Sequence, residues 1–444
     1  MPARVWPGFG DAALAERVLA AWREHGSEAS RSLLAELAPE QLQASGPLVQ
    51  ELRWRLQGHA GPRLLVDGVW FCRSHGGITR VWEQVLRCWA LPELVTPAAP
   101  VRILDRDSHL ALLDRLDAVE AEPVNPLDWT AMGALAADNQ RHAQAWGADV
   151  FLSSWISTCG DSAPTRPELA LVHDCIPERS ASLQPELRTL RQRWLGGASG
   201  FLAVSASTAQ DLERFRQLPS GSIPWCHLAP EPIFGQVHAG MRLWPQLKLD
   251  AGLRQPYVLL PATSSIGSYK NPELVAQALL EPGLEAVQLV LSGLAASTHA
   301  QALVQRWPAL QERLVVAGFT DLQLALAYHH ALAVVLPSRV EGFGLPALEA
   351  LAAGAVVLLA DSRGLREAGG GACPRFHPEQ PTQLAAWLRL LLDPMSAEWL
   401  MHRLRSRRSL HLHERNPDLF GLALLAMARC LSGCDGVAPV QLPS

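Results

Sequence analysis

Two patterns of hydrophobic and polar positions divide the chain. Between residues 10 and 58 apolar side chains recur every three or four positions, as in the series Leu14, Val18 and Trp22. This spacing predicts amphipathic helices. Beyond this stretch, short apolar runs alternate with amphipathic helical stretches, which is typical of β-α units and predicts an α/β fold with parallel sheets.

The apolar runs fall into two blocks, separated by a passage rich in proline and glycine at about 230–255. The strands predicted in the first block are Leu64–Phe71, Val101–Leu104, Asp149–Ser153, Leu169–His173, Phe201–Val204 and a weaker one at Ile223–Leu228. Those in the second block are Tyr257–Pro261, Gln288–Leu291, Leu314–Val316, Ala333–Leu336 and Val356–Ala360. An apolar stretch at Leu419–Leu431 predicts a last helix.

These blocks predict four parts of the chain. They are an N-terminal helical extension (1–60), a first Rossmann-like domain (61–240), a second one (250–415), and a C-terminal helix and tail (416–444) that pack back toward the first domain. Open α/β sheets bind ligands beside the carboxyl ends of their strands. We therefore expect the chemistry in the loops that leave these strands, in a cleft that the two domains face.

Composition and charge exclude several classes of protein. With 48% hydrophobic and 18% charged residues the chain is folded rather than disordered. Its net charge of -5 gives no electrostatic basis for a nucleic-acid partner. The eight cysteines lack the spacing of zinc ligands, so reduced thiols and a cytoplasmic location are expected. We see neither a signal-peptide pattern nor a run of about 18 apolar residues that would span a membrane.

One arginine-rich stretch has two interpretations, a contact with a membrane or a solvated helix. The segment from Trp399 to Arg415 is rich in arginine and could touch an anionic membrane from its inner face. A solvated helix face is the simpler interpretation of the same residues.

The most informative loop follows the predicted strand Ala333–Leu336. It reads Pro-Ser-Arg-Val-Glu-Gly-Phe-Gly-Leu-Pro, and Pro346 suits the first position of a helix. Gly342 and Gly344 let a ligand approach the backbone, and a helix N-terminus favours an anion. Glu341 and Glu349 can accept hydrogen bonds from sugar and ribose hydroxyls, although a solvated Glu341 and a Glu349 that complements the helix dipole are the plain alternatives.

This stretch resembles the E-x7-E signature, in its EGFGLP-x-x-E form, of the family 4 glycosyltransferases with the GT-B fold. In that family the first glutamate contacts the donor sugar, the loop amides contact sugar and phosphate, and the second glutamate holds the ribose. The resemblance gives these roles to Glu341, to the loop formed by Gly342, Phe343, Gly344 and Leu345, and to Glu349. It covers about 67–431 and is tightest at 333–367.

The loop after Tyr257–Pro261 ends in Lys270-Asn271-Pro272. Asn271 and Pro272 predict a helix start, which together with a lysine suits a diphosphate whose charge grows as the donor bond breaks. The stretch resembles the donor loop of the family, in which the lysine binds the diphosphate. Many members carry an arginine five residues before this lysine, where this chain has Ser265, so Ser265 is an expected donor contact that departs from the family.

Three further stretches resemble family motifs less specifically. Gly318 and Phe319 match a segment that lines the base pocket, and Gly76 and Gly77 match a glycine-rich loop over the donor phosphates. His173, in Val-His-Asp-x-x-Pro, matches a histidine beside the donor sugar, whereas a lone histidine at a strand end is otherwise structural.

The resemblance implies a retaining glycosyltransferase, most readily for a mannose-like hexose, with Glu341, His173 and Lys270 as catalytic residues. It would use a nucleotide-diphosphate sugar and a glycan or lipid-linked acceptor in cell-surface polysaccharide or glycoconjugate synthesis. No metal is expected, because no Asp-x-Asp pair follows a strand near the donor loops, the nearest being Asp105 and Asp107. Alternatives are a sugar-nucleotide epimerase, a phosphorylase and a catalytically silent nucleotide-sugar-binding protein.

Overall fold

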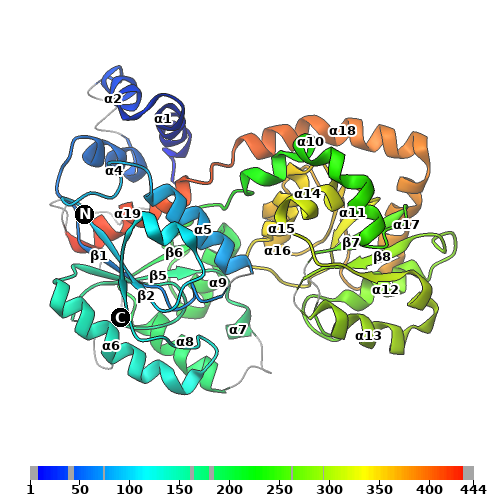
Figure 1. The fold of residues 1–444 in the computed structure, drawn as a ribbon, viewed down its shortest axis with the longest axis horizontal. Helices are drawn as coiled ribbons and strands as arrows, with labels where there is room; N and C mark the ends of the chain where they lie inside the picture. The colour runs from blue at the N-terminus through cyan, green and yellow to red at the C-terminus, as the bar shows by residue number, and fades with distance from the viewer. Residues whose placement is uncertain are drawn as a thin grey trace. The chain divides into compact units, whose positions relative to one another are not determined.

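The computed structural model describes residues 9–38, 45–73, 76–160, 165–179, 185–261, 264–293 and 295–433. The chain divides into two compact units, shown in Figure 1. Unit 1 comprises Met1–Leu228 together with Asn416–Ser444, and unit 2 comprises Ala229–Arg415. The chain therefore leaves unit 1 once, builds unit 2 and returns for its last helix.

Unit 1 is built on a parallel sheet of six strands within the described residues, in the order β3-β2-β1-β4-β5-β6. The strands are β1 (Leu64–Asp67), β2 (Val101–Asp105), β3 (Asp117–Glu120), β4 (Val150–Ser153), β5 (Glu168–Val172) and β6 (Gly200–Ala203). The helices are α1 (Ala12–His25), α2 (Ser27–Ala35), α4 (Pro47–Leu56), α5 (Gly77–Trp89), α6 (Met132–Trp146), α7 (Ile176–Arg179), α8 (Pro185–Gly197), α9 (Ala206–Arg216) and α19 (Leu419–Ser432), with short 3-10 turns at Ala111–Arg115 and Trp129–Ala131.

Unit 2 repeats this plan with the order β12-β11-β10-β7-β8-β9, again parallel. Its strands are β7 (Tyr257–Leu260), β8 (Gln288–Leu291), β9 (Leu314–Val316), β10 (Ala333–Leu336), β11 (Val357–Ala360) and β12 (Arg375–Phe376). Its helices are α10 (Val237–Gly240), α11 (Trp244–Asp250), α12 (Pro272–Leu279), α13 (Ala296–Arg306), α14 (Asp321–His330), α15 (Leu345–Ala352), α16 (Arg363–Gly369), α17 (Pro381–Leu392) and α18 (Pro394–His413), with 3-10 turns at Pro232–Gly235, Met241–Leu243 and Pro308–Arg313.

Both sheets have the strand order of a dinucleotide-binding fold. Counted within each unit the order is 3-2-1-4-5-6, so the direction of winding reverses between the first and fourth strands. The predicted apolar runs form the fully buried strands β1, β4, β5, β6, β7, β8, β10 and β11. Such continuous burial is what helices on both faces of a parallel sheet produce, and Figure 1 shows helices on both sides of each sheet.

The strand predicted at Ile223–Leu228 is absent. In this segment Trp225 forms only an isolated bridge to Ala203, and Pro224 lacks the N–H that a longer ladder would need. Two strands were not predicted. The edge strand β3 of unit 1 has the half-polar sequence Asp-Ala-Val-Glu, and β12 of unit 2 has only two residues.

Helix α4 of the N-terminal extension packs against the last helix in unit 1. Twelve of the fourteen residues of α19 are buried, and Trp89 of α5 donates from Nε1 to the Gly421 carbonyl at 2.9 Å. Glu51 of α4 is fully buried between the guanidinium groups of Arg55 and Arg429, the second of which belongs to α19. The N-terminal and C-terminal helices are therefore joined by charge pairs as well as by apolar contact.

Candidate donor-sugar site

The carboxyl ends of β7 and β10 mark the point in unit 2 where the winding reverses. The two strands are neighbours, with Ala333 opposite Val258 and Val334 opposite Leu259. Ligands of open α/β sheets bind in the crevice outside such strand ends. The loop after β7 carries Ser265 and Lys270, and the loop after β10 carries Glu341, so the topology brings these two predicted segments to one place.

The structure joins Lys270 and Glu341 directly. Lys270 Nζ lies 2.6 Å from Glu341 Oε1, although the residues are 71 positions apart. Their side chains are 23% and 13% exposed, so the pair is largely shielded but still open to solvent. The lysine predicted to bind a diphosphate and the glutamate predicted to contact the sugar are thus hydrogen-bonded to each other.

The loop that carries Glu341 is packed through glycines. Gly344 has φ 120°, and a Cβ on it would lie 2.7 Å from Cδ2 of Leu365. Gly364 of α16 faces the loop from the other side, where a Cβ would lie 2.3 Å from the Glu341 carbonyl oxygen. Glycine at both positions is therefore required for this loop to lie against α16. No motif in the sequence marks Gly364.

Helix α15 starts at Leu345, one residue before the predicted Pro346, directly after this loop. Gly342, Phe343, Gly344 and Leu345 are all buried. Glu349 is the fifth residue of the helix, one residue further in than a start at Pro346 predicts, and it is 2% exposed. Its carboxylate is thus held inside unit 2 rather than solvated.

Asn271 connects three loops of the site. We expected it to cap α12 with its side chain, but no side-chain cap bond forms and the residue has φ 55°. Its Nδ2 donates instead to the carbonyls of Pro337 at 3.2 Å and Pro378 at 2.7 Å. The residue beside Lys270 thereby fixes the strand end before Glu341 and the loop after β12.

Arg339 makes a second set of connections between the same loops. Its backbone N–H donates to Tyr269 O at 2.8 Å, and its guanidinium donates to Ser268 O at 3.1 Å. The same guanidinium pairs with Glu379 at 2.6 Å and Glu273 at 3.3 Å, and these acids raise its pKa, Glu379 most. The Lys270 loop and the Glu341 loop are therefore held in register by side chains that sequence analysis missed.

Of the remaining predicted positions in unit 2, Ser265 lies on the Lys270 loop, and Gly318 and Phe319 lie on another loop. Ser265 is exposed, and its carbonyl accepts from Ser268 N at 3.2 Å in a turn. Gly318 and Phe319 follow β9, which β8 separates from β7. Gly318 is exposed with nothing within 4 Å of a hypothetical Cβ, so its backbone is open to a ligand.

In unit 1 the glycine-rich loop ends at the start of α5. Gly76 has φ 130° at the helix N-cap, and neither it nor Gly77 would bring a Cβ within 4 Å of another residue. Both are exposed. Ser74 and His75, which belong to the same motif, lie outside the described residues.

His173 follows β5 at the carboxyl end of the unit 1 sheet. Burial, with a smaller effect from the cation of Arg191, lowers the pKa of its imidazole to about 3. Arg191 in turn pairs with Glu178 at 2.6 Å. The imidazole is therefore neutral near pH 7 and can donate one hydrogen bond and accept another.

The nearest Asp-x-Asp sequence, Asp105 to Asp107, encloses an arginine that is buried in the core of unit 1. Between Asp105 and Asp107, Arg106 is buried and pairs with Asp67 at 2.6 Å and Asp138 at 2.8 Å. Among the described residues no group of three or more His, Cys, Asp or Glu side chains lies close enough together to hold a metal ion. Over the same residues, no helix combines the length and apolar character needed to cross a membrane.

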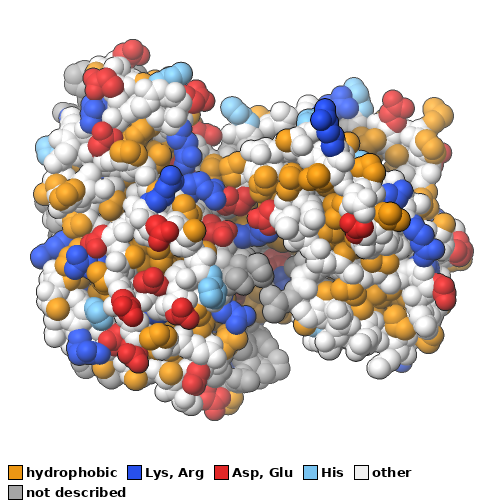
Figure 2. Space-filling model, in the orientation of Figure 1, with side chains coloured by type: hydrophobic (Ala, Val, Ile, Leu, Met, Phe, Trp, Pro, Cys, Tyr) orange, Lys and Arg blue, Asp and Glu red, His pale blue; other side chains and the backbone are white. Residues whose placement is uncertain are grey.

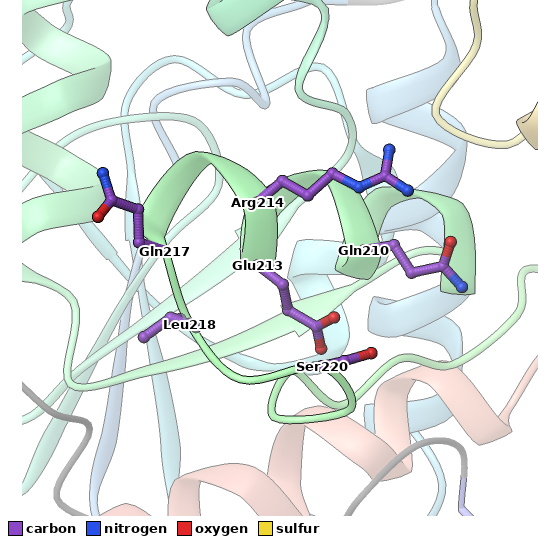
Figure 3. Close-up of a pocket in the computed structure, with 6 residues that line it drawn as sticks. All are labelled: Gln210, Glu213, Arg214, Gln217, Leu218 and Ser220. Atoms are coloured by element: carbon purple, nitrogen blue, oxygen red, sulfur yellow. The ribbon is translucent and has the colours of Figure 1, made fainter.

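A hollow of about 490 Å³ lies elsewhere in unit 1, along α9 (Figure 3). It is lined by Gln210, Glu213, Arg214, Gln217, Leu218 and Ser220. Glu213 there accepts a bond from Ile223 N at 3.1 Å. None of the predicted site residues lines this hollow.

Part of unit 2 matches a known protein family. Residues 258–393, which contain Lys270, Glu341 and Glu349, match the family described as Glycosyl transferases group 1. The serotype-specific mannosyltransferase WbdA of Escherichia coli is 27% identical over 237 residues, which are 50% of this chain and 29% of that protein. The chain therefore matches less than a third of the length of this relative.

Solved structures share the fold. WaaG, a glycosyltransferase involved in lipopolysaccharide biosynthesis, superposes with a TM-score of 0.62 at 13% identity, covering 82% of this chain and 99% of its own. HepE of Anabaena, in complex with UDP-glucose, gives 0.59 at 15% identity, covering 82% and 98%. Sucrose-phosphate synthase of Thermosynechococcus elongatus gives 0.60 at 18% identity, covering 84% and 100%.

The fold is that of the GT-B glycosyltransferases. The predicted fold, with two Rossmann-like units, is confirmed. The family match is confined to residues 258–393, which lie in unit 2.

Proposed function

We propose that the chain is a retaining, metal-independent glycosyltransferase of the family 4 type. It transfers a hexose, mannose most readily, from a nucleotide-diphosphate sugar to a glycan or lipid-linked acceptor in cell-surface polysaccharide or glycoconjugate synthesis. The observation that carries the proposal is the contact of Lys270 with Glu341 at the switch point of unit 2. The similarity to WbdA supports the sugar.

In this proposal the donor replaces the ion pair. Lys270 turns to the diphosphate, and Glu341 accepts a hydrogen bond from a sugar hydroxyl. The amides at Gly342, Phe343, Gly344 and Leu345 stabilise phosphate charge at the start of α15. Because the two groups neutralise each other until the donor arrives, neither charge is left uncompensated in a shielded site.

The other residues bind or orient the donor. Glu349 holds the ribose, Gly318 and Phe319 line the base, and Ser265 lies beside the diphosphate. From unit 1, Gly76 and Gly77 contact the phosphates and His173 contacts the sugar. We propose a cytoplasmic protein at the inner face of the membrane, where such donors and lipid-linked acceptors meet.

The chemical step is attack on the same face that the diphosphate leaves. The bond from the anomeric carbon to the phosphate oxygen breaks, and its electron pair stays on the phosphate, which Lys270 stabilises. The acceptor hydroxyl forms the new bond, and its proton passes to the departing phosphate oxygen. This sequence needs no carboxylate nucleophile, in contrast to double-displacement glycosidases.

A thermal-shift panel tests the proposal first. A ligand that binds only the native state raises the melting temperature. We expect a shift with one nucleotide diphosphate and its sugar, measured for GDP, UDP, GDP-mannose and UDP-glucose. An epimerase would convert the sugar without acceptor, whereas a transferase releases nucleotide diphosphate in step with glycosylation of the acceptor. The absence of any shift and any release across the panel contradicts the proposal.

Metal removal gives a second prediction. With Lys270 and helix N-termini stabilising the leaving group, turnover should survive excess EDTA with little change in rate. The measurement is nucleotide release with and without the chelator. Loss of turnover that Mn²⁺ restores would place charge stabilisation on a metal instead.

The third prediction concerns Glu349. Because it holds a ribose that does not react, Glu349→Gln should leave kcat nearly unchanged and raise the donor KM by roughly 5- to 150-fold, equivalent to about 1–3 kcal/mol for a hydrogen bond to a charged group. Steady-state kinetics at saturating acceptor measure both constants. A melting temperature close to wild type must accompany the result, since Glu349 is buried. A fall in kcat at unchanged KM would assign Glu349 to the chemical step.

A further inference from the structure

Helix α18 exposes an unusual surface for a helix of a compact unit. It spans twenty residues, Pro394–His413, and of these only Leu400 is buried. Its inner face is tied to unit 2 by polar bonds. Arg408 donates to the Gly354 carbonyl at 2.9 Å, and His411 Nε2 lies 2.6 Å from the Ala368 carbonyl. These contacts fix which side of the helix faces outward.

The outward side carries large apolar side chains at helical spacing. Met395, Trp399 and Leu410 are 81%, 57% and 63% exposed, and steps of four and eleven residues place them on one stripe. Single exposed apolar residues are ordinary on a protein surface. Three aligned on one helix, including a tryptophan, form a patch that favours contact with another phase or molecule.

Cations surround this stripe. The Arg403 guanidinium lies 5.4 Å from the centre of the Trp399 ring, and Arg405 is exposed beside it. Arg407 turns back toward unit 2, where it donates to the Gly371 carbonyl at 3.5 Å. The helix has four arginines and one acidic residue, Glu398, in a chain whose net charge is -5. Figure 2 shows basic side chains along the edge of unit 2 where Figure 1 places α18.

We propose that the outer stripe of α18 docks on an anionic lipid bilayer. Apolar and tryptophan side chains enter the interface, while arginines extend along it to the phosphates of the headgroups. The charge complementarity selects this occupant, because each arginine near an anionic surface strengthens binding. This proposal concerns where the protein acts and goes beyond the proposed reaction, since sugar transfer does not require that α18 bind a membrane.

Vesicle flotation of the full chain tests the proposal. We expect binding to vesicles of phosphatidylcholine mixed with phosphatidylglycerol, little binding to phosphatidylcholine alone, and release at high salt. The double variant Arg403→Glu and Arg405→Glu should lower the partition coefficient roughly tenfold or more. The triple variant Met395→Ser, Trp399→Ser and Leu410→Ser should lower it by a similar factor.

Matched controls lie on unit 1. Leu127→Ser, at a 45% exposed residue, and Arg214→Glu, with a 67% exposed side chain, change the same kinds of group elsewhere. They should leave binding unchanged. The donor-induced thermal shift should persist in every variant, which separates this proposal from the proposed reaction.

Three results would overturn it. These are no binding to the anionic vesicles, equal binding by wild type and both α18 variants, and loss of binding in the controls to the same degree. Light scattering provides a further arm. A dimer that dissociates in the Trp399 variant would assign the stripe to a second copy of the chain and refute the lipid surface.

Discussion

Glu341→Gln is expected to lower kcat by roughly a hundredfold or more, the size of losing one preorganised electrostatic contact at the reacting centre. Positive charge develops on the sugar as the donor bond breaks, so an interaction made by Glu341 strengthens in the transition state. Interactions of this kind govern the chemical step, whereas remote ones govern affinity. The substitution also frees Lys270 from its 2.6 Å partner. The donor KM should therefore stay the same or fall.

The measurement is steady-state transfer with the donor that the thermal-shift panel identifies. Glu312→Gln, at an exposed residue of the same unit, is the matched control and should keep wild-type kinetics. Glu341→Asp should recover part of the rate, since it restores the charge at a shorter reach. If Glu341→Gln retains both kcat and KM, the match to the E-x7-E signature carries no catalytic meaning.

Glu51→Leu should lower the free energy of unfolding of unit 1 by about 3–5 kcal/mol, because it leaves two buried guanidinium groups without their carboxylate. Arg55 and Arg429 both pair with Glu51, and the three side chains are at most 3% exposed. The measurement is urea denaturation followed by tryptophan fluorescence. Eleven of the fifteen tryptophans precede residue 229, so this signal reports mainly on unit 1.

Two further variants serve as controls for Glu51→Leu. Glu28→Gln breaks the exposed pair with Arg31 in α2 and should cost less than about 1 kcal/mol. Replacing all three members of the buried cluster, with Arg55→Met and Arg429→Met added, should recover much of the loss, since no uncompensated charge then remains. A Glu51→Leu variant within 1 kcal/mol of wild type would show that water reaches this cluster.

The sequence predicted the fold better than it predicted the support of the site. Runs such as Tyr257–Leu260 and Ala333–Leu336 are apolar throughout because helices cover both faces of their sheets, and that pattern is visible without a structure. Edge strands are not so marked. Asp117–Glu120 begins and ends with charged residues that are exposed to solvent. Arg375–Phe376 is too short to show an alternation of apolar and polar residues.

Lys270 and Glu341 could each be placed at a strand end, but their contact could not be predicted. It depends on β7 lying beside β10, a neighbour relation that the order of strands along the chain does not state. The roles of Asn271 and Arg339 were hidden for a related reason. Their partners are largely backbone carbonyls, at Pro337, Pro378 and Ser268, and a carbonyl has no signature in a sequence.

The return of the chain to unit 1 sets an order for its synthesis. The twelve buried residues of α19 pack against α4, α5 and β6. They leave the ribosome only after all of unit 2 has been synthesised. At a synthesis rate of about 5–20 residues per second, the first part of unit 1 lacks α19 for roughly ten to forty seconds while Ala229–Arg415 is made. During that interval unit 1 presents an apolar groove and the charge of Glu51 without Arg429. We expect unit 2 to reach its native state first, and nascent chains halted before residue 416 to be the ones that chaperones hold.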